Sequence, residues 1–133
     1  MRADTQTISI DVPPDTVLSY LENPQNLPRW AVGFAKAVRP AGDGWIVETG
    51  SGEMGFRIDA DARTRSVDYW MTPAPGVTVV AASRVIPRGR GSEYVFTQFQ
   101  GPAMSDEGFA KSAQTVRHEL TVLKALLEVE CPL

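Results

Sequence analysis

Among the side chains whose chemistry could serve a reaction, two tyrosines and one histidine stand out. Tyr69 and Tyr94 each fall, by strand alternation, on a face of apolar residues. A buried phenol usually finds a hydrogen-bond partner, so either hydroxyl could donate to a ligand carbonyl. His118 lies nearly opposite the apolar stripe of a predicted helix, which places it in solvent. No paired carboxylates and no nucleophile–base set emerge, so catalytic residues stay unassigned, and Tyr69 and Tyr94 are the candidates if the protein is an enzyme.

Composition narrows the classes of function. The 133 residues carry a net charge of −3, which argues against non-specific nucleic-acid binding, because that binding depends on Lys and Arg. No stretch approaches the length of apolar sequence that a membrane span needs, and the first residues have no apolar core of a secretory signal. The single cysteine, Cys131, suits a reducing cytoplasm. We therefore expect one cytoplasmic domain over residues 1–133, with no nucleic acid, no membrane span, no metal and no cofactor.

The last quarter of the chain predicts a long helix over residues 105–130. Ser105 can cap its first turn, and the two acidic residues that follow suit the positive end of the helix dipole. At 3.6 residues per turn the apolar side chains fall on one narrow stripe, which consists of Phe109, Ala113, Val116, Leu120, Leu123 and Leu127. A rod that is apolar on one side must lie across an apolar surface of similar length.

The segments before this helix predict the surface that it needs. Residues 5–12 alternate as a half-buried strand, a short helix follows over 14–22, and a second helical turn covers 24–30. Six further strands, joined by short turns, are expected at residues 35–39, 45–49, 53–61, 66–72, 77–86 and 92–100. Short connections make neighbouring strands antiparallel. The expected fold class is α+β: a bent antiparallel sheet of about seven strands wrapped around the long C-terminal helix.

The strand pattern also assigns faces of the sheet. Pairing Ala60 with Arg65 places the apolar and aromatic residues of that hairpin on one face, with Trp70 as the exception. That face carries Met54, Phe56, Ile58, Val67, Tyr69 and Met71, and Trp70 points outward. On the last two strands the inner sets are Val79, Ala81, Ser83 and Val85, and Tyr94, Phe96 and Gln98. Arg84 is then expected on the outer face.

Several stretches of sequence resemble a known group of proteins. They are VPPDTV at 12–17 leading to Leu21, NLPRW at 26–30, RVIP at 84–87, GSEYVFT at 91–97, GPAMSDEGF at 101–109 and ELTVLKALLE at 119–128. Together they resemble the START-like superfamily, also called SRPBCC or birch-pollen-allergen-like, and within it the polyketide cyclase/dehydrase-like group. The resemblance covers essentially the whole chain. It implies a helix-grip fold with a cavity between helix and sheet, whereas it says little about chemistry, because the superfamily hosts carriers, receptors and enzymes.

The predicted ligand site lines this implied cavity. Trp30 and Phe34 are expected at one end, with Met104 and Phe109 near the same mouth, because methionine and aromatic walls are typical of small-molecule pockets. The full set of predicted contacts is Trp30, Phe34, Met54, Phe56, Tyr69, Met71, Ser83, Tyr94, Phe96, Gln98, Met104, Phe109, Val116 and Leu120.

Three readings of function stay open at this point. The first is a binding module for a small hydrophobic or aromatic molecule. The second is an enzyme of the cyclase/dehydratase type that acts on a polyketide-like substrate, in which confinement supplies much of the rate. The third is a filled core without a ligand, in which Trp70 and the outer face of the sheet serve a homodimer.

Overall fold

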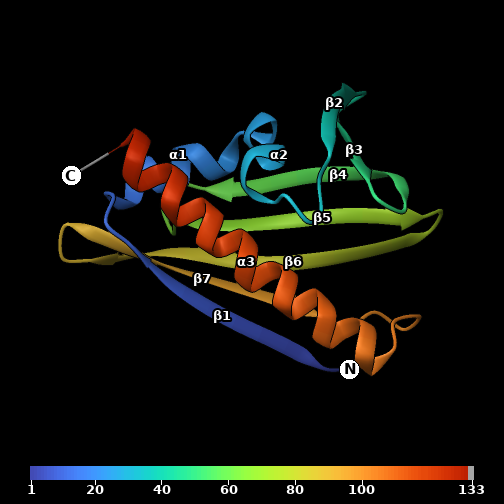
Figure 1. The fold of residues 1–133 in the computed structure, drawn as a ribbon. Helices are drawn as coiled ribbons and strands as arrows, with labels where there is room; N and C mark the ends of the chain where they lie inside the picture. Colours follow the sequence, from blue (N-terminus) through green and yellow to red (C-terminus); the bar gives the residue numbers. More distant parts are fainter. Residues whose placement is uncertain (132–133) are drawn as a thin grey trace.

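A seven-stranded antiparallel sheet and one long helix make up most of the protein (Figure 1). The computed structural model describes residues 1–131. In chain order the elements are β1 (Ala3–Ile10), α1 (Pro14–Glu22), the 3-10 turn η1 (Pro24–Asn26), α2 (Leu27–Trp30), β2 (Ala37–Ala41), β3 (Gly44–Thr49), β4 (Gly52–Asp61), β5 (Ser66–Ala74), β6 (Val77–Arg88), β7 (Gly91–Phe99) and α3 (Asp106–Glu130). The strand order β1-β7-β6-β5-β4-β3-β2 sets β1 and β2 at opposite edges, and α1, η1 and α2 connect them. The expected α+β helix-grip fold is confirmed.

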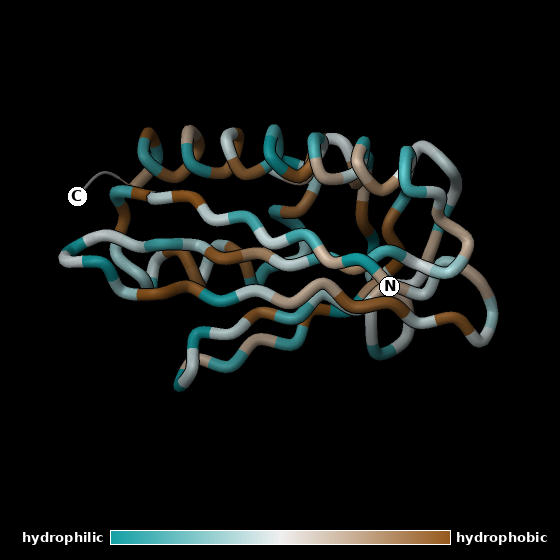
Figure 2. The backbone as a smooth tube through the Cα atoms, turned by 90° about the horizontal axis from the view of Figure 1, so that it is seen from below, coloured by the Kyte–Doolittle hydropathy of each residue, from teal (hydrophilic) through white to brown (hydrophobic). Residues whose placement is uncertain are grey.

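Helix α3 forms a layer of its own over one face of the sheet (Figure 2). Its buried apolar residues are Phe109, Val116, Leu120, Leu123 and Leu127, which all belong to the predicted stripe, and Ala113 is half-buried. The helix begins where expected, because the Ser105 side chain accepts a hydrogen bond from the backbone N–H of Gly108 at 3.0 Å. Burial of this stripe against the sheet supplies the hydrophobic stabilisation that holds the two layers together.

The faces of the sheet are as predicted, but one register is wrong. In the hairpin of β4 and β5, Ala60 pairs with Val67 and Ile58 with Tyr69, two residues away from the predicted pairing. The turn explains the difference: the side chain of Asp61 accepts from the N–H of Arg63, and Arg65 adopts a left-handed φ of 59°. Because the shift is an even number of residues, every side chain keeps its face.

Strand ends and outward residues show smaller differences. Strand β2 begins two residues later than expected, because the backbone N–H groups of Phe34 and Ala35 both bond back to the carbonyl of Ala31. Arg84 is exposed, and its Nε donates to the Thr64 carbonyl at 3.2 Å, so its predicted outward orientation is confirmed. Trp70 lies on the outer side under the guanidinium of Arg57, 5.5 Å from the ring centre.

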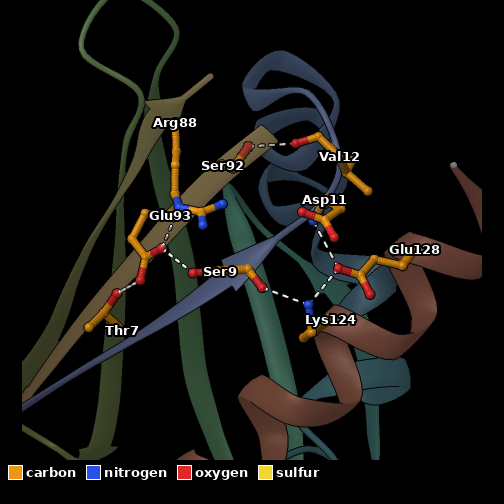
Figure 3. Close-up of polar contacts among 9 residues, drawn as sticks. All are labelled: Thr7, Ser9, Asp11, Val12, Arg88, Ser92, Glu93, Lys124 and Glu128. Atoms are coloured by element: carbon orange, nitrogen blue, oxygen red, sulfur yellow. Dashed lines mark hydrogen bonds and ion pairs between the residues drawn. The ribbon is translucent and has the colours of Figure 1, made fainter. Parts of the chain in front are cut away.

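Polar contacts tie the first strand to the last turns of the helix (Figure 3). Lys124 Nζ donates to the Ser9 carbonyl at 2.9 Å and pairs with Glu128 at 2.6 Å. Glu128 in turn accepts from the N–H of Asp11 at 2.8 Å, beyond the end of β1. Charge-assisted bonds of this kind fix the position of the helix along the sheet, which determines what its inner face meets.

Candidate functional site

An apolar cavity of about 680 Å³ lies between α3 and the sheet. Walls from α2, β4, β5, β6, β7 and α3 meet around it. The sequence-predicted residues that line it are Trp30, Phe34, Met54, Phe56, Tyr69, Met71, Phe96, Gln98, Met104 and Val116. Small side chains contribute to its size, since Ala81 lies on the β6 wall. A cavity of this volume, apolar with few polar groups, is typical of small-molecule sites.

Four predicted contacts lie outside the lining. Tyr94 and Leu120 are fully buried in the core, and the hydroxyl of Ser83 is bonded to a backbone carbonyl. Phe109 is also buried, beneath the guanidinium of Arg2 at 5.7 Å from the ring centre. A direct ligand contact by any of these four side chains stays a prediction.

Aromatic rings form much of the wall, with Tyr69 at their centre. Its ring centre lies 6.3 Å from those of Trp30 and Phe56, and 5.9 Å from that of Phe96. Phe34 extends the group through Phe56 at 6.4 Å. These separations are in the range of favourable edge-to-face and offset contacts, so the wall is stiff and offers flat faces to a ring-shaped guest.

The hydroxyls of Tyr69, Tyr94 and Ser83 form a chain that ends on the backbone. Ser83 Oγ donates to the Val67 carbonyl at 2.7 Å, and the Tyr94 hydroxyl donates to Ser83 Oγ at 2.9 Å. The hydroxyl of Tyr69, 2.9 Å from that of Tyr94, is therefore the donor in the last bond. Burial raises the pKa of both tyrosines, so both phenols are neutral near pH 7. With all three protons committed, Tyr69 offers the cavity an acceptor rather than a donor.

Glu119 is a site residue that the sequence reasoning missed. It lies on the inner face of α3, three residues after Val116, lines the cavity and is 5% exposed. Its Oε2 accepts from the N–H groups of Gly33 at 3.1 Å and Phe34 at 3.0 Å. Burial raises the pKa of Glu119 to about 7, against a lowering by those two N–H groups. The sequence feature that could have identified Glu119 as a site residue is its helical spacing, because residues 116, 119, 120 and 123 share one face of the helix.

A second polar position lies two helical turns away. Ser112 Oγ donates to Gln98 Oε1 at 3.0 Å, and both residues line the cavity. Gln98 Nε2 is buried and has no partner among the described residues. Seven residues of helix separate Ser112 from Glu119, which is about 10 Å along the axis at 1.5 Å per residue. The apolar cavity therefore carries polar groups at two separate positions.

The cavity opens where β6, β7 and the start of α3 meet. Val77, Phe99 and Met104 line it and are also among the exposed large apolar side chains.

By contrast, His118 is exposed on the helix and is absent from the lining, as its helical position predicted. Residues 1–131 contain no group of three or more His, Cys, Asp or Glu side chains placed to hold a metal ion. Within the same range, the helices are all too short or too polar to cross a membrane.

The bent antiparallel sheet and the long helix packed on it have the helix-grip fold that the START-like resemblance implied. The chain belongs to the family described as polyketide cyclase / dehydrase and lipid transport, whose model matches residues 1–128. A sequence search of curated proteins finds no match.

Solved structures share the fold at low sequence identity. The Aha1 dimer from Colwellia psychrerythraea has a TM-score of 0.75 and 16% identity over 97% of this chain and 98% of that chain. A START superfamily protein from Mycobacterium smegmatis has a TM-score of 0.74 and 11% identity over 95% of this chain and 97% of that chain. The di-domain ARO/CYC BexL of the BE-7585A biosynthetic pathway has a TM-score of 0.74 and 18% identity, over 96% of this chain and 47% of that chain. These likenesses concern the fold.

Proposed function

We propose that the protein binds a small hydrophobic or aromatic molecule in the cavity between the sheet and α3. The observation that carries the proposal is an apolar space of about 680 Å³ that opens at one end. Burying a guest there removes apolar surface of both guest and wall from water, at roughly 25 cal/mol per Å². The family description, which joins cyclases with lipid transport, supports a ligand-binding role.

A fluorescent naphthalene probe tests the proposal. N-phenylnaphthylamine becomes brighter in an apolar site, so titration should give saturable binding at one site per chain. Ala81→Phe places a ring into the cavity from the β6 wall and should abolish that binding. Ala82→Phe is the matched control, since the neighbouring residue of the strand points to the other face and should leave the affinity unchanged. Absence of saturable binding by the wild-type protein would contradict the proposal.

An alternative is an enzyme of the cyclase/dehydratase type acting on a polyketide-like substrate. It is favoured by the family description and by a carboxyl in the cavity whose pKa, about 7, suits proton transfer near neutral pH. Tyr69→Phe and Tyr94→Phe should then lower turnover and leave binding largely intact, whereas Glu119→Gln should abolish proton transfer. Turnover unchanged in all three variants would remove this alternative.

A homodimer through the outer face of the sheet and a cytoplasmic location stay proposals. A depression of about 360 Å³ on that face includes Trp70, and Aha1 from Colwellia psychrerythraea, which shares the fold, forms a dimer. Sedimentation of the wild-type protein and of Trp70→Ser tests the homodimer. Concentration-dependent association that Trp70→Ser removes would support it, and a monomer at high concentration would contradict it.

A further inference from the structure

Glu119 lines the cavity, and among the described residues only one of its two carboxyl oxygens has a hydrogen-bond partner. Both bonds to the carboxyl, from Gly33 and Phe34, end on Oε2, and Oε1 has no partner among the described residues. Among the described residues the buried side-chain polar atoms without a partner are Tyr20 Oη, Trp70 Nε1 and Gln98 Nε2, and Oε1 is not one of them, so it is accessible rather than enclosed. The two bonds to Oε2 hold the carboxyl in place on the wall of an apolar cavity, which leaves Oε1 as its available acceptor.

The surroundings make this oxygen the strongest acceptor of the cavity. Of the residues that line the cavity, Glu119 and Tyr69 titrate, and the phenol of Tyr69 is neutral. Within residues 1–131 no charged side chain compensates Glu119: its pKa is raised by burial and lowered by the two backbone N–H groups. A buried carboxylate oxygen without a donor is costly, so a guest that brings a donor gains free energy that a purely apolar guest does not.

We propose that Glu119 Oε1 selects the ligand, so that the cavity takes apolar molecules that carry a hydrogen-bond donor, a hydroxyl or an N–H, at the end buried beside α3. This inference rests on the proposed ligand-binding function and adds the polar chemistry of the guest. It also excludes a class: a fatty-acid or aromatic carboxylate that entered with its charged end inward would meet a second negative charge in a water-poor space.

The matched ligands for a test are β-naphthol and its methyl ether, which differ by the donor hydrogen and one methyl group. Calorimetric titration should give tighter binding of the naphthol to the wild-type protein by about tenfold at about pH 8, where Glu119 is ionised. In Glu119→Gln, the amide oxygen is needed to accept the hydrogen bonds from the N–H groups of Gly33 and Phe34. The amide NH₂ therefore takes the position of Oε1. The preference for the naphthol should then vanish or reverse.

Two further arms keep the result independent of that one variant. At about pH 5.5 the carboxyl of the wild-type protein is protonated and presents a donor, so its ligand preference should approach that of Glu119→Gln. Glu107→Gln, a change in the exposed first turn of the same helix, is the control and should keep the wild-type preference at both pH values.

The outcomes separate the two claims. Binding of both ligands with the same ratio of affinities in the wild-type protein and Glu119→Gln, at both pH values, would overturn the role of Glu119 and leave the binding function standing. Absence of binding by both naphthalenes and by N-phenylnaphthylamine would overturn the binding function, and this inference with it.

Discussion

At the scale of single residues, Glu119 and the tyrosine pair have opposite consequences for chemistry. The hydroxyls of Tyr69 and Tyr94 are used up within their own chain of bonds, so they stiffen the wall. Glu119 has one carboxyl oxygen without a partner among the described residues, and burial raises its pKa to about 7. The sequence alone favours the tyrosines, because the aromatic residues stand out on alternating strands. The structure makes the carboxyl the more reactive group.

The raised pKa of Glu119 makes its contribution to stability depend on pH. The folded state holds this proton more tightly than the unfolded chain, so the contribution is fully present below about pH 4.5 and is lost as the pH rises through about 7. Replacement by Gln removes this dependence. Between about pH 4.5 and pH 8 the wild-type free energy of unfolding should fall by about 3 kcal/mol relative to that of Glu119→Gln. Urea unfolding of both proteins across this range measures the difference, and a constant difference would contradict the assignment.

Tyr94 should matter more for stability than Tyr69. Tyr94→Phe removes the middle of the hydroxyl chain and leaves both the Tyr69 donor and the Ser83 acceptor without a partner in the core. We expect a loss of about 2–3 kcal/mol, compared with about 1 kcal/mol for Tyr69→Phe, which removes only the end of the chain. Chemical denaturation of the two single variants and the double variant tests the order. Equal losses for the two single variants would contradict the order of hydroxyl groups in this chain of hydrogen bonds.

At the scale of elements, the contact between α3 and the segment before β2 positions the carboxyl. Gly33 makes this contact possible, because a Cβ built there would lie 2.4 Å from Thr115 Cγ2. The absence of a side chain lets the N–H groups of Gly33 and Phe34 reach Glu119. A close approach of backbone to helix is a common reason for glycine outside turns.

Gly33→Ala should push this segment away from the helix. We expect a loss of stability of about 1–3 kcal/mol from the overlap, together with a weaker hold on Glu119. Thr115→Ser removes the methyl group that causes the overlap and keeps the hydroxyl that bonds to the Lys111 carbonyl. The double variant should therefore recover most of the loss. A double variant no better than Gly33→Ala would place the cause elsewhere.

Elements with a strong local signal were predictable from the sequence, and contacts between distant segments were not. The proline and asparagine residues that flank α1 predicted its observed ends, and Ser105 predicted the start of α3. Register between β4 and β5 depended on the conformation of Arg65 in the turn, which alternation of side chains cannot reveal. Glu119 was missed because its partners are backbone N–H groups some 85 residues earlier, and backbone donors leave no mark in the sequence.

At the scale of the whole molecule, the cavity is a region where the core is incomplete. Core residues such as Leu120, Leu123 and Leu127 are fully buried towards one end of α3, while Ser112 and Thr115 line the cavity towards the other. Helix α3 and the sheet thus pack tightly at the C-terminal end of the helix, and the cavity separates them nearer its beginning. Atoms that line an empty apolar space lack contacts on one side, so a guest or an added side chain should recover them.

This division predicts that a ring added from the wall will act like a bound guest. Saturating N-phenylnaphthylamine should raise the melting temperature of the wild-type protein, since a ligand at a hundred times its Kd adds about 2.7 kcal/mol. Ala81→Phe should melt above the ligand-free wild-type protein and show little further rise with the probe, because its ring occupies the same space. Thermal unfolding with and without the probe measures both effects. A melting temperature of Ala81→Phe well below that of the wild-type protein, as overpacking by about 1–3 kcal/mol would give, would mean that this space is already filled in solution.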